Sequence, residues 1–138
     1  MADKIEFELV SPERLLLSEP VDMVVVPGTE GNFGVLPGHA PFASTVRADV
    51  IEVYEGNAVR DRIFVSGGFA EVTPERVTVL ADEAISVDRL DRAAIEQSIR
   101  SLEQEIADSD TESERAPLEA RLRIEQAKIA ALGRVGKA

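Results

Sequence analysis

Apolar and polar residues alternate along roughly the first 85 positions of this 138-residue chain, which is the pattern of strands with one buried face. Ile5, Phe7 and Leu9 alternate with Glu6 and Glu8. Further short apolar or β-branched runs, each bounded by turn residues, follow at 14–17, 21–26, 43–46, 50–54, 62–65, 69–72 and 77–80. Strands of this length and spacing predict an antiparallel β-sandwich or barrel.

Two tight turns fix the pairing of neighbouring runs. Glu55, Gly56 and Asn57 separate the runs at 50–54 and 59–65, and residues 73–75, Thr-Pro-Glu, separate those at 69–72 and 77–80. Turn residues at these places predict two β-hairpins whose register is locally specified.

Beyond about Ile85 the apolar spacing changes from two residues to three or four. One stripe consists of Ile95, Ile99, Leu102 and Ile106, and a second of Leu118, Leu122, Ile129 and Leu132. A polar segment with a proline separates them, which predicts an antiparallel hairpin of two helices. The chain is therefore expected to divide into a β-sandwich domain at 1–86 and a helical domain at 87–138.

The helix starts are less sharply marked than the stripes. Asp88, with Asp91 three residues later, is a candidate N-cap of the first helix. For the second helix, Thr111 with Glu114 has the spacing of a capping box, whereas Pro117 favours a first-turn position. We expect the second helix to begin just before Pro117.

Composition narrows the functional classes. Lys and Arg number 15 against 26 Asp and Glu, a net charge of −11, which disfavours binding to a nucleic-acid backbone. The chain has no cysteine, and its N-terminus has the pattern of neither a signal peptide nor a transit peptide. No stretch approaches the ~20 apolar residues of a membrane span, so we expect any membrane association to go through a partner.

The two halves of the helical region carry opposite charge. Residues 103–114 contain six acidic side chains and no basic one, whereas residues 115–138 contain six basic and two acidic ones. The basic arm includes Arg121, Arg123 and Lys128, which either contact an acidic partner or form ordinary ion pairs within the hairpin.

The segment at 27–42, PGTEGNFGVLPGHAPF, contains four glycines and three prolines around the only histidine, His39. Such a segment turns repeatedly between two strands, which predicts a shaped surface suited to docking on another protein. A lone histidine cannot form a histidine metal cluster, and no nucleophile motif accompanies it, so a structural or interface role is expected. The glycine spacing lacks the Gly-Lys-Ser/Thr ending of a phosphate loop.

Together with FVSGGFAEV at 64–72 and VTVLADEAI at 77–85, this segment resembles the epsilon subunit of F-type ATP synthases, the equivalent of the mitochondrial delta subunit. The resemblance covers essentially the whole chain. It implies a sandwich of about ten short strands followed by two helices, in a non-catalytic subunit of the central stalk that couples the gamma subunit to the c-subunit ring. It also implies that the helices, when extended towards the catalytic alpha/beta head, restrain ATP hydrolysis.

The resemblance further implies where contacts fall. Glu30, Gly31, Asn32 and Phe33 would face the c ring, and His39 would lie near gamma; Arg121, Arg123 and Lys128 would be the regulatory contacts. It implies a peripheral position on the cytoplasmic face of the bacterial inner membrane, since a transit peptide is missing.

Some members of this family bind ATP through a tract resembling Ile/Leu-Asp-x-x-Arg-Ala at the start of the first helix. Here Asp91 is followed at the arginine position by Ala94, and aligning on Asp88 recovers Arg92 one residue too late, a rotation of about 100° around a helix. We therefore expect no cofactor, and the residues of this tract to serve as helix-start residues. Two alternatives remain: a free-standing β-sandwich binding module, and a nucleotide-sensing switch.

Overall fold

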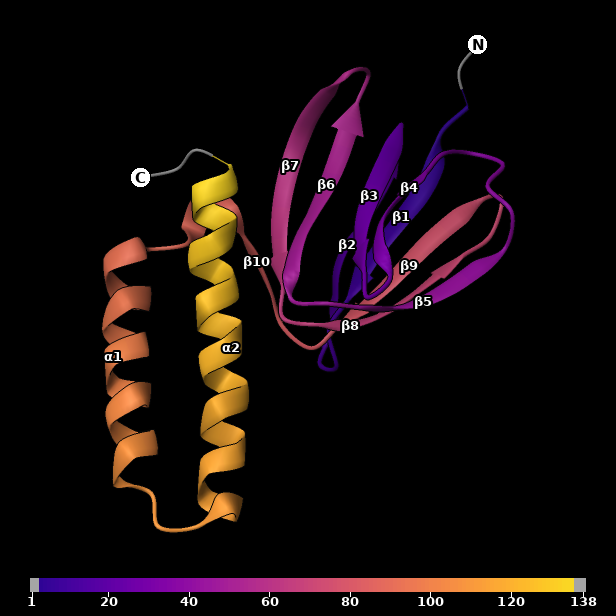
Figure 1. Ribbon diagram of the computed structural model, residues 1–138. Coiled ribbons are helices and arrows are strands. Elements are labelled where there is room, and N and C mark those ends of the chain that lie inside the picture. The colour runs from indigo at the N-terminus through magenta and orange to yellow at the C-terminus, as the bar shows by residue number, and fades with distance from the viewer. Residues whose placement is uncertain (1–2, 136–138) are drawn as a thin grey trace. The chain divides into compact units, whose positions relative to one another are not determined.

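A computed structural model describes residues 3–135 of the protein (Figure 1). Its internal contacts divide the protein into two units, Met1–Asp88 and Arg89–Ala138. The first unit contains the strands and the second contains the two helices, so each is described by itself. The expected class, a β-sandwich followed by a helical hairpin, is confirmed.

The described part of the first unit contains ten strands in one curled sheet. They are β1 (Ile5–Val10), β2 (Leu15–Val21), β3 (Met23–Gly28), β4 (Gly31–Val35), β5 (Phe42–Val46), β6 (Asp49–Glu55), β7 (Ala58–Val65), β8 (Gly68–Val72), β9 (Arg76–Ala81) and β10 (Ala84–Ser86). Their order in the sheet is β10-β7-β6-β3-β5-β8-β9-β1-β2, with β4 paired to β3. All these pairs are antiparallel except β1 with β9, which is parallel.

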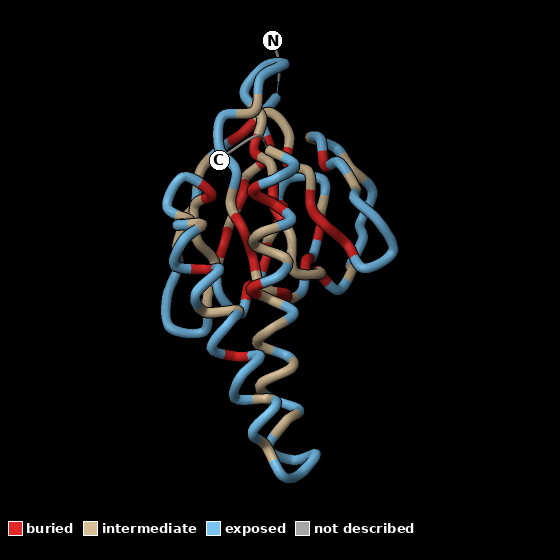
Figure 2. Tube along the Cα trace, turned by 60° about the vertical axis from the view of Figure 1, so that its left-hand side comes forward, coloured by how far each residue is buried: buried red, intermediate tan, exposed pale blue. Residues whose placement is uncertain are grey.

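Alternation along the strands builds the core, as the sequence predicts. Ile5, Phe7 and Leu9 are at most 2% exposed, whereas Glu6 and Glu8 between them face outwards. The inward residues of β3, β6, β8 and β9 join them in one cluster of buried hydrophobic side chains. Figure 2 shows these buried positions along the strands. The sandwich thus contains a complete hydrophobic core of its own.

Gly68 is required where β8 crosses between β5 and β9. Its φ is +148°, and a Cβ at this position would overlap the backbone carbonyl oxygen of Leu80. No rotamer change can relieve a clash between a Cβ and a neighbouring backbone, so only glycine fits.

Both predicted hairpins form, with Gly56 and Asn57 between β6 and β7 and residues 73–75 between β8 and β9. Two strands were not predicted from the sequence pattern. β10 has only three residues, and β4 lies inside the segment expected to turn repeatedly. That expectation is wrong for the first half of the segment: Gly28 pairs with Gly31 and Val24 with Val35, so β3 and β4 form a regular hairpin.

The second unit is an antiparallel helical hairpin, α1 (Arg92–Asp108) and α2 (Glu112–Arg134), preceded by a 3₁₀ turn at Val87–Arg89 (Figure 1). Asp91, rather than Asp88, is the N-cap of α1, because its side chain accepts a hydrogen bond from the backbone nitrogen of Ala94. Asp88 lies in the 3₁₀ turn that precedes α1.

The expected start of the second helix before Pro117 is also wrong. Thr111 caps α2 by accepting a hydrogen bond from the nitrogen of Glu114, and the Glu114 carboxylate accepts one from the nitrogen of Asp110. Pro117 lies inside the helix. It forgoes one backbone hydrogen bond, to the carbonyl of Ser113 in the first turn, and the two capping contacts help offset that loss.

Candidate functional site

The turn between β3 and β4 consists of Thr29 and Glu30, and both residues are exposed. Gly28, which precedes the turn, is buried, and a Cβ there would lie 2.9 Å from the Gly31 carbonyl oxygen and 2.9 Å from the Phe33 ring. The backbone N–H of Thr29 donates a hydrogen bond to the carbonyl of Thr45 at 3.0 Å, and the hydroxyl oxygens of the two threonines lie 2.6 Å apart. The turn is therefore tied to β5 and presents the Glu30 carboxylate to solvent.

Arg47, in the connection between β5 and β6, holds the same hairpin from the other side. Its Nη1 donates to the Gly28 carbonyl at 2.6 Å, and its Nη2 donates to Asn32 Oδ1 at 2.6 Å and to Asp49 Oδ2 at 3.1 Å. Its backbone nitrogen donates to the carbonyl of Pro27 at 2.9 Å. One guanidinium thus links the strand that enters the turn to the strand that leaves it.

The residues predicted for docking in the 27–42 segment separate into two kinds. Glu30, Gly31 and Asn32 are exposed at the end of the hairpin. Phe33 instead points to the core side, where its ring meets the Phe42 ring edge-on at a centroid distance of 5.0 Å. His39 is half-buried, and its Nδ1 lies 2.7 Å from the Ala40 carbonyl. The structure brings Phe33 and His39 to Phe42, and leaves the tip of the turn available.

A second exposed feature is apolar and runs across four strands. Val10 on β1 lies opposite Leu15 on β2 and Leu80 on β9, and Leu80 lies opposite Phe69 on β8. Leu15, Leu80 and Phe69 are 56%, 52% and 43% exposed. We name these four residues the apolar ridge. Large apolar side chains scattered singly are normal on a protein surface, but a contiguous row marks a contact surface.

Acidic groups border the apolar ridge on both sides. Two residues before Leu80 on β9, Thr78 lies opposite Glu8 on β1 and Glu71 on β8. On the other side of the ridge, Asp82 follows β9 and is exposed. A hollow of about 250 Å³ beside the ridge is lined by Val10, Ser11, Pro12, Leu80, Ala81 and Asp82. Glu8 is already paired with Arg76, so the arrangement suits a partner with an apolar stripe and cationic side chains that meet Glu71 and Asp82.

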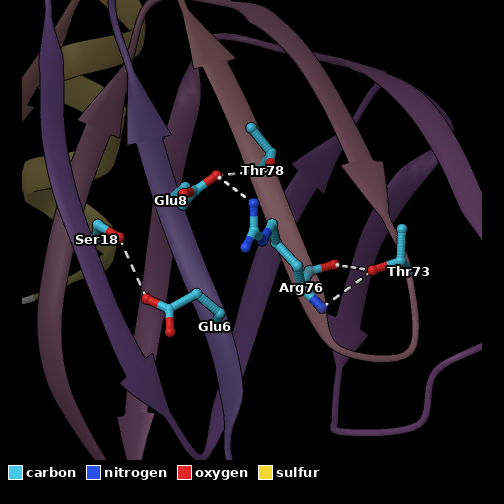
Figure 3. A network of polar contacts seen from close by, with 6 residues as sticks. All are labelled: Glu6, Glu8, Ser18, Thr73, Arg76 and Thr78. Atoms are coloured by element: carbon cyan, nitrogen blue, oxygen red, sulfur yellow. Dashed lines mark hydrogen bonds and ion pairs between the residues drawn. The ribbon is translucent and has the colours of Figure 1, made fainter.

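The polar network beside the ridge is shown in Figure 3. Arg76 Nη1 lies 3.5 Å from Glu8 Oε1, and Thr78 Oγ1 donates to the same oxygen at 3.4 Å. Ser18 Oγ donates to Glu6 Oε2 at 3.2 Å. These contacts link β2 to β1 and β1 to β9. Arg76 and Thr78 also line a polar hollow of about 410 Å³. The network supports the outward face of the sheet, which carries the ridge.

The three basic residues expected to act as regulatory contacts have different environments. Glu125 is 4% exposed, with Lys128 Nζ 2.8 Å and Arg121 Nη2 3.5 Å from its Oε2. The Lys128 contact is an ion pair whose angles fall outside hydrogen-bond geometry. Arg123 is exposed and makes no ion pair with the described residues. Arg123 is thus the member of the three that a partner reaches most directly.

The residues considered for nucleotide binding lie in the 3₁₀ turn and at the start of α1. Asp88 belongs to the 3₁₀ turn, Asp91 uses its carboxylate to cap α1, and Arg92 is the first residue of α1.

One carboxylate of the sandwich has a perturbed acidity. The Lys4 ammonium, 2.9 Å from Asp22 Oδ1, holds the pKa of Asp22 below its ordinary value, and the backbone N–H of Gly56 adds to the effect. Asp22, between β2 and β3, is thus tied to the residue before β1 by the ion pair and to the turn between β6 and β7 by the Gly56 hydrogen bond, which is a structural role.

Three groups of residues escape the sequence analysis. Glu125 continues the spacing of Leu118, Leu122 and Ile129, so its burial could have been found from the stripe. The apolar ridge and Arg47 leave no such signal, because both depend on which strands become neighbours.

Within residues 3–135, no group of three or more His, Cys, Asp or Glu side chains is arranged to hold a metal ion. No helix in that range is long and apolar enough to cross a membrane.

The fold and its surfaces define a two-unit protein: a sandwich that exposes an apolar ridge and an acidic turn, followed by a charged helical hairpin. Family models identify both units. Residues 4–87 match the model of the beta-sandwich domain of the ATP synthase delta/epsilon subunit, and residues 91–138 match that of the C-terminal domain of the ATP synthase epsilon subunit. The protein belongs to the ATP synthase epsilon subunit family.

Relatives agree with this assignment. The protein is 58% identical over 134 residues to the ATP synthase epsilon subunit of Rhodospirillum centenum, a match that covers 94% of this sequence and 92% of the relative. It is 52% identical over 131 residues to that of Rhodospirillum rubrum, covering 95% and 98%.

Solved structures share the fold. A subunit of the Euglena gracilis mitochondrial ATP synthase, solved as OSCP/F1/c-ring, matches with a TM-score of 0.80 at 26% identity, covering 96% of this protein and 83% of that one. A subunit of the Tetrahymena thermophila mitochondrial enzyme, solved as central stalk and c-ring, matches with a TM-score of 0.62 at 12% identity, covering 94% and 97%. The second likeness shows the fold alone.

Proposed function

We propose that this protein is a rotor subunit in the central stalk of a proton-translocating ATP synthase. In that place it couples the gamma subunit to the c-subunit ring during ATP synthesis, and its helices restrain ATP hydrolysis. The family assignment supports the placement, and the Euglena assembly that contains the similar subunit also contains F1 and a c-ring.

The observation that carries the proposal is the apolar ridge. About half of the surface of its three most exposed side chains faces water, so roughly half of the stabilisation that full burial would give them is not realised. Docking on gamma would bury them, and the acidic groups on both sides would select a partner surface with flanking cations. We assign this face of the sandwich to gamma.

The turn between β3 and β4 is assigned to the c ring. It is a short hairpin end with an exposed carboxylate, held by Thr45 and Arg47, so it can transmit force without bending. His39 lies on the segment that follows β4 and remains a proposed residue of the gamma side. The Phe33 ring, which packs on Phe42, supports the turn from within.

The helical unit is proposed to act as the brake, with Arg123 as its most accessible cation. Asp91 and the residues beside it act as helix-start groups in this proposal, and no nucleotide is needed there. The catalytic chemistry belongs to the alpha/beta head. The bacterial relatives of this protein support a position on the cytoplasmic face of the inner membrane, where gamma and the c ring hold the protein peripherally.

The test uses the matching alpha/beta/gamma head stripped of this subunit. The full-length protein and a truncation that lacks residues 91–138 are titrated, and binding and ATP hydrolysis are recorded together. Both proteins should bind with similar affinity, because the sandwich has its own core, and only the full-length protein should suppress hydrolysis.

Binding of the full-length protein without suppression would leave a coupling subunit with no brake. Failure of the truncation to bind would contradict the assignment of docking to the sandwich. Failure of both proteins to bind would refute the proposed function.

A further inference from the structure

We propose that Arg47 is a positioning residue that fixes the turn between β3 and β4 in the orientation in which it docks. The inference starts from the number of separate segments that one side chain joins. The guanidinium contacts the Gly28 carbonyl before the turn, the Asn32 side chain after it, and the Asp49 carboxylate at the start of β6.

The geometry makes the guanidinium hard to replace. Nη1 and Nη2 each make a 2.6 Å contact with a different strand of the hairpin, so the two strands are held at a set separation by a planar, rigid group. A lysine ammonium is a single point of charge on a flexible stem and cannot reproduce a planar fork. Nη2 also lies 3.1 Å from Asp49, whose side chain is 15% exposed, so the arginine is itself held in place.

The hairpin has few other restraints at this end. Beyond its pairing with β4, β3 pairs with β6 over residues 23–25, away from the turn, and with β5 near the turn through a single register pair, Gly28 with Val46. Thr29 contacts Thr45, and the backbone of Arg47 contacts Pro27. These contacts hold the entering strand, whereas the side chain of Arg47 is the described contact that reaches across to Asn32 on the leaving strand. Loss of the guanidinium should free the turn without opening the core.

A rigid turn matters because a loosened one must be ordered again when it docks. Fixing the backbone of about one residue again corresponds to roughly tenfold weaker binding. This consequence for docking rests on the proposed function, in which the turn meets the c ring. The rigidity of the turn in the isolated protein does not rest on it.

The experiment compares Arg47→Gln with Arg62→Gln in the full-length protein. Arg62 is an exposed β7 residue 3.7 Å from Glu52, so the control removes the same charge from a strand that β6 separates from the β3–β4 hairpin. Arg47→Lys keeps the charge without the fork, and Asn32→Ala removes one contact while it leaves the pair of Arg47 with Asp49 intact.

The first readout is ¹⁵N relaxation of residues 29–31 in the isolated protein. Arg47→Gln should make these amides mobile on the picosecond to nanosecond timescale, Arg47→Lys and Asn32→Ala should do so in part, and Arg62→Gln should not. Amides of the core strands should stay unchanged in every variant. A turn that stays rigid in both Arg47→Gln and Asn32→Ala would overturn the proposal.

The second readout is affinity for the stripped alpha/beta/gamma head and for the stripped complete assembly with its c ring. Arg47→Gln should match the wild type on the head and bind the complete assembly roughly tenfold more weakly. Equal losses in Arg47→Gln and Arg62→Gln would refute the positioning role. If the wild type binds neither assembly, the proposed function fails, and the relaxation data alone decide on Arg47.

Discussion

Removing the apolar ridge should weaken docking on gamma while the sandwich stays folded. The perturbation is the triple substitution Leu15→Thr, Phe69→Thr and Leu80→Thr. Threonine favours strands, and all three side chains are already about half exposed, so each substitution should change the free energy of unfolding by less than about 1 kcal/mol.

The magnitude follows from the exposed fractions. Full burial of a leucine or phenylalanine stabilises by about 1.5–3 kcal/mol, and these three residues have 56%, 43% and 52% of their surface left to bury. Because threonine keeps part of this burial, each substitution removes about 1 kcal/mol on docking, and the three together about 2–3 kcal/mol. Since 1.4 kcal/mol is tenfold in affinity, the triple variant should bind gamma roughly 30- to 100-fold more weakly.

The assay is a titration of the stripped alpha/beta/gamma head, with thermal unfolding recorded for every variant. Val59→Thr is the matched control, because Val59 lies on β7, which pairs with β6 and β10 rather than with a strand of the ridge. The control should bind like the wild type. If the folded triple variant binds gamma as tightly as the wild type does, the ridge is not the gamma surface and the reasoning is refuted.

Three further predictions concern charge, backbone fit and pH. Arg123→Glu should partly relieve the inhibition of hydrolysis with unchanged helix content by circular dichroism, and the effect should fade as salt is added; Lys128→Glu should instead lower helix content, because it places a second carboxylate beside buried Glu125. If the Arg123→Glu variant inhibits hydrolysis as strongly as the wild type does, the basic arm is ordinary helix-surface charge and not a regulatory contact. Gly68→Ala should destabilise the sandwich by more than ~4 kcal/mol in urea unfolding, whereas Gly133→Ala, with no atom within 4 Å of the added Cβ, should be neutral or stabilising by up to ~1 kcal/mol; similar midpoints for the two would contradict the clash at Leu80. Asp22→Asn should destabilise the protein at neutral pH, because the pKa of Asp22 is lowered in the folded state. The extra stability of the wild type is therefore present above the ordinary pKa of 3.8 and is lost as the pH falls through the pKa of the folded state. Stability curves of the two proteins that stay separated by the same amount well below pH 3.8 would rule out this account.

The elements with many residues of one period were predictable from the sequence. The inward residues of β1 and β9, the two tight hairpins and both helices follow from local alternation and spacing. The errors lie at boundaries and in short elements. β4 was hidden because its glycines indicate turns. The start of α2 was misplaced because the capping contacts of Thr111 and Glu114 help offset the backbone hydrogen bond that Pro117 forgoes.

By itself the sequence determined the two-part organisation and the family, because periodicity and motifs are properties of neighbouring residues. Only the tertiary structure decided that Leu15, Val10, Leu80 and Phe69 form one row, because the parallel pairing of β1 with β9 joins segments about 70 residues apart. It also decided that Arg47 spans the hairpin, since a hydrogen bond between distant strands depends on their register, which no local pattern encodes.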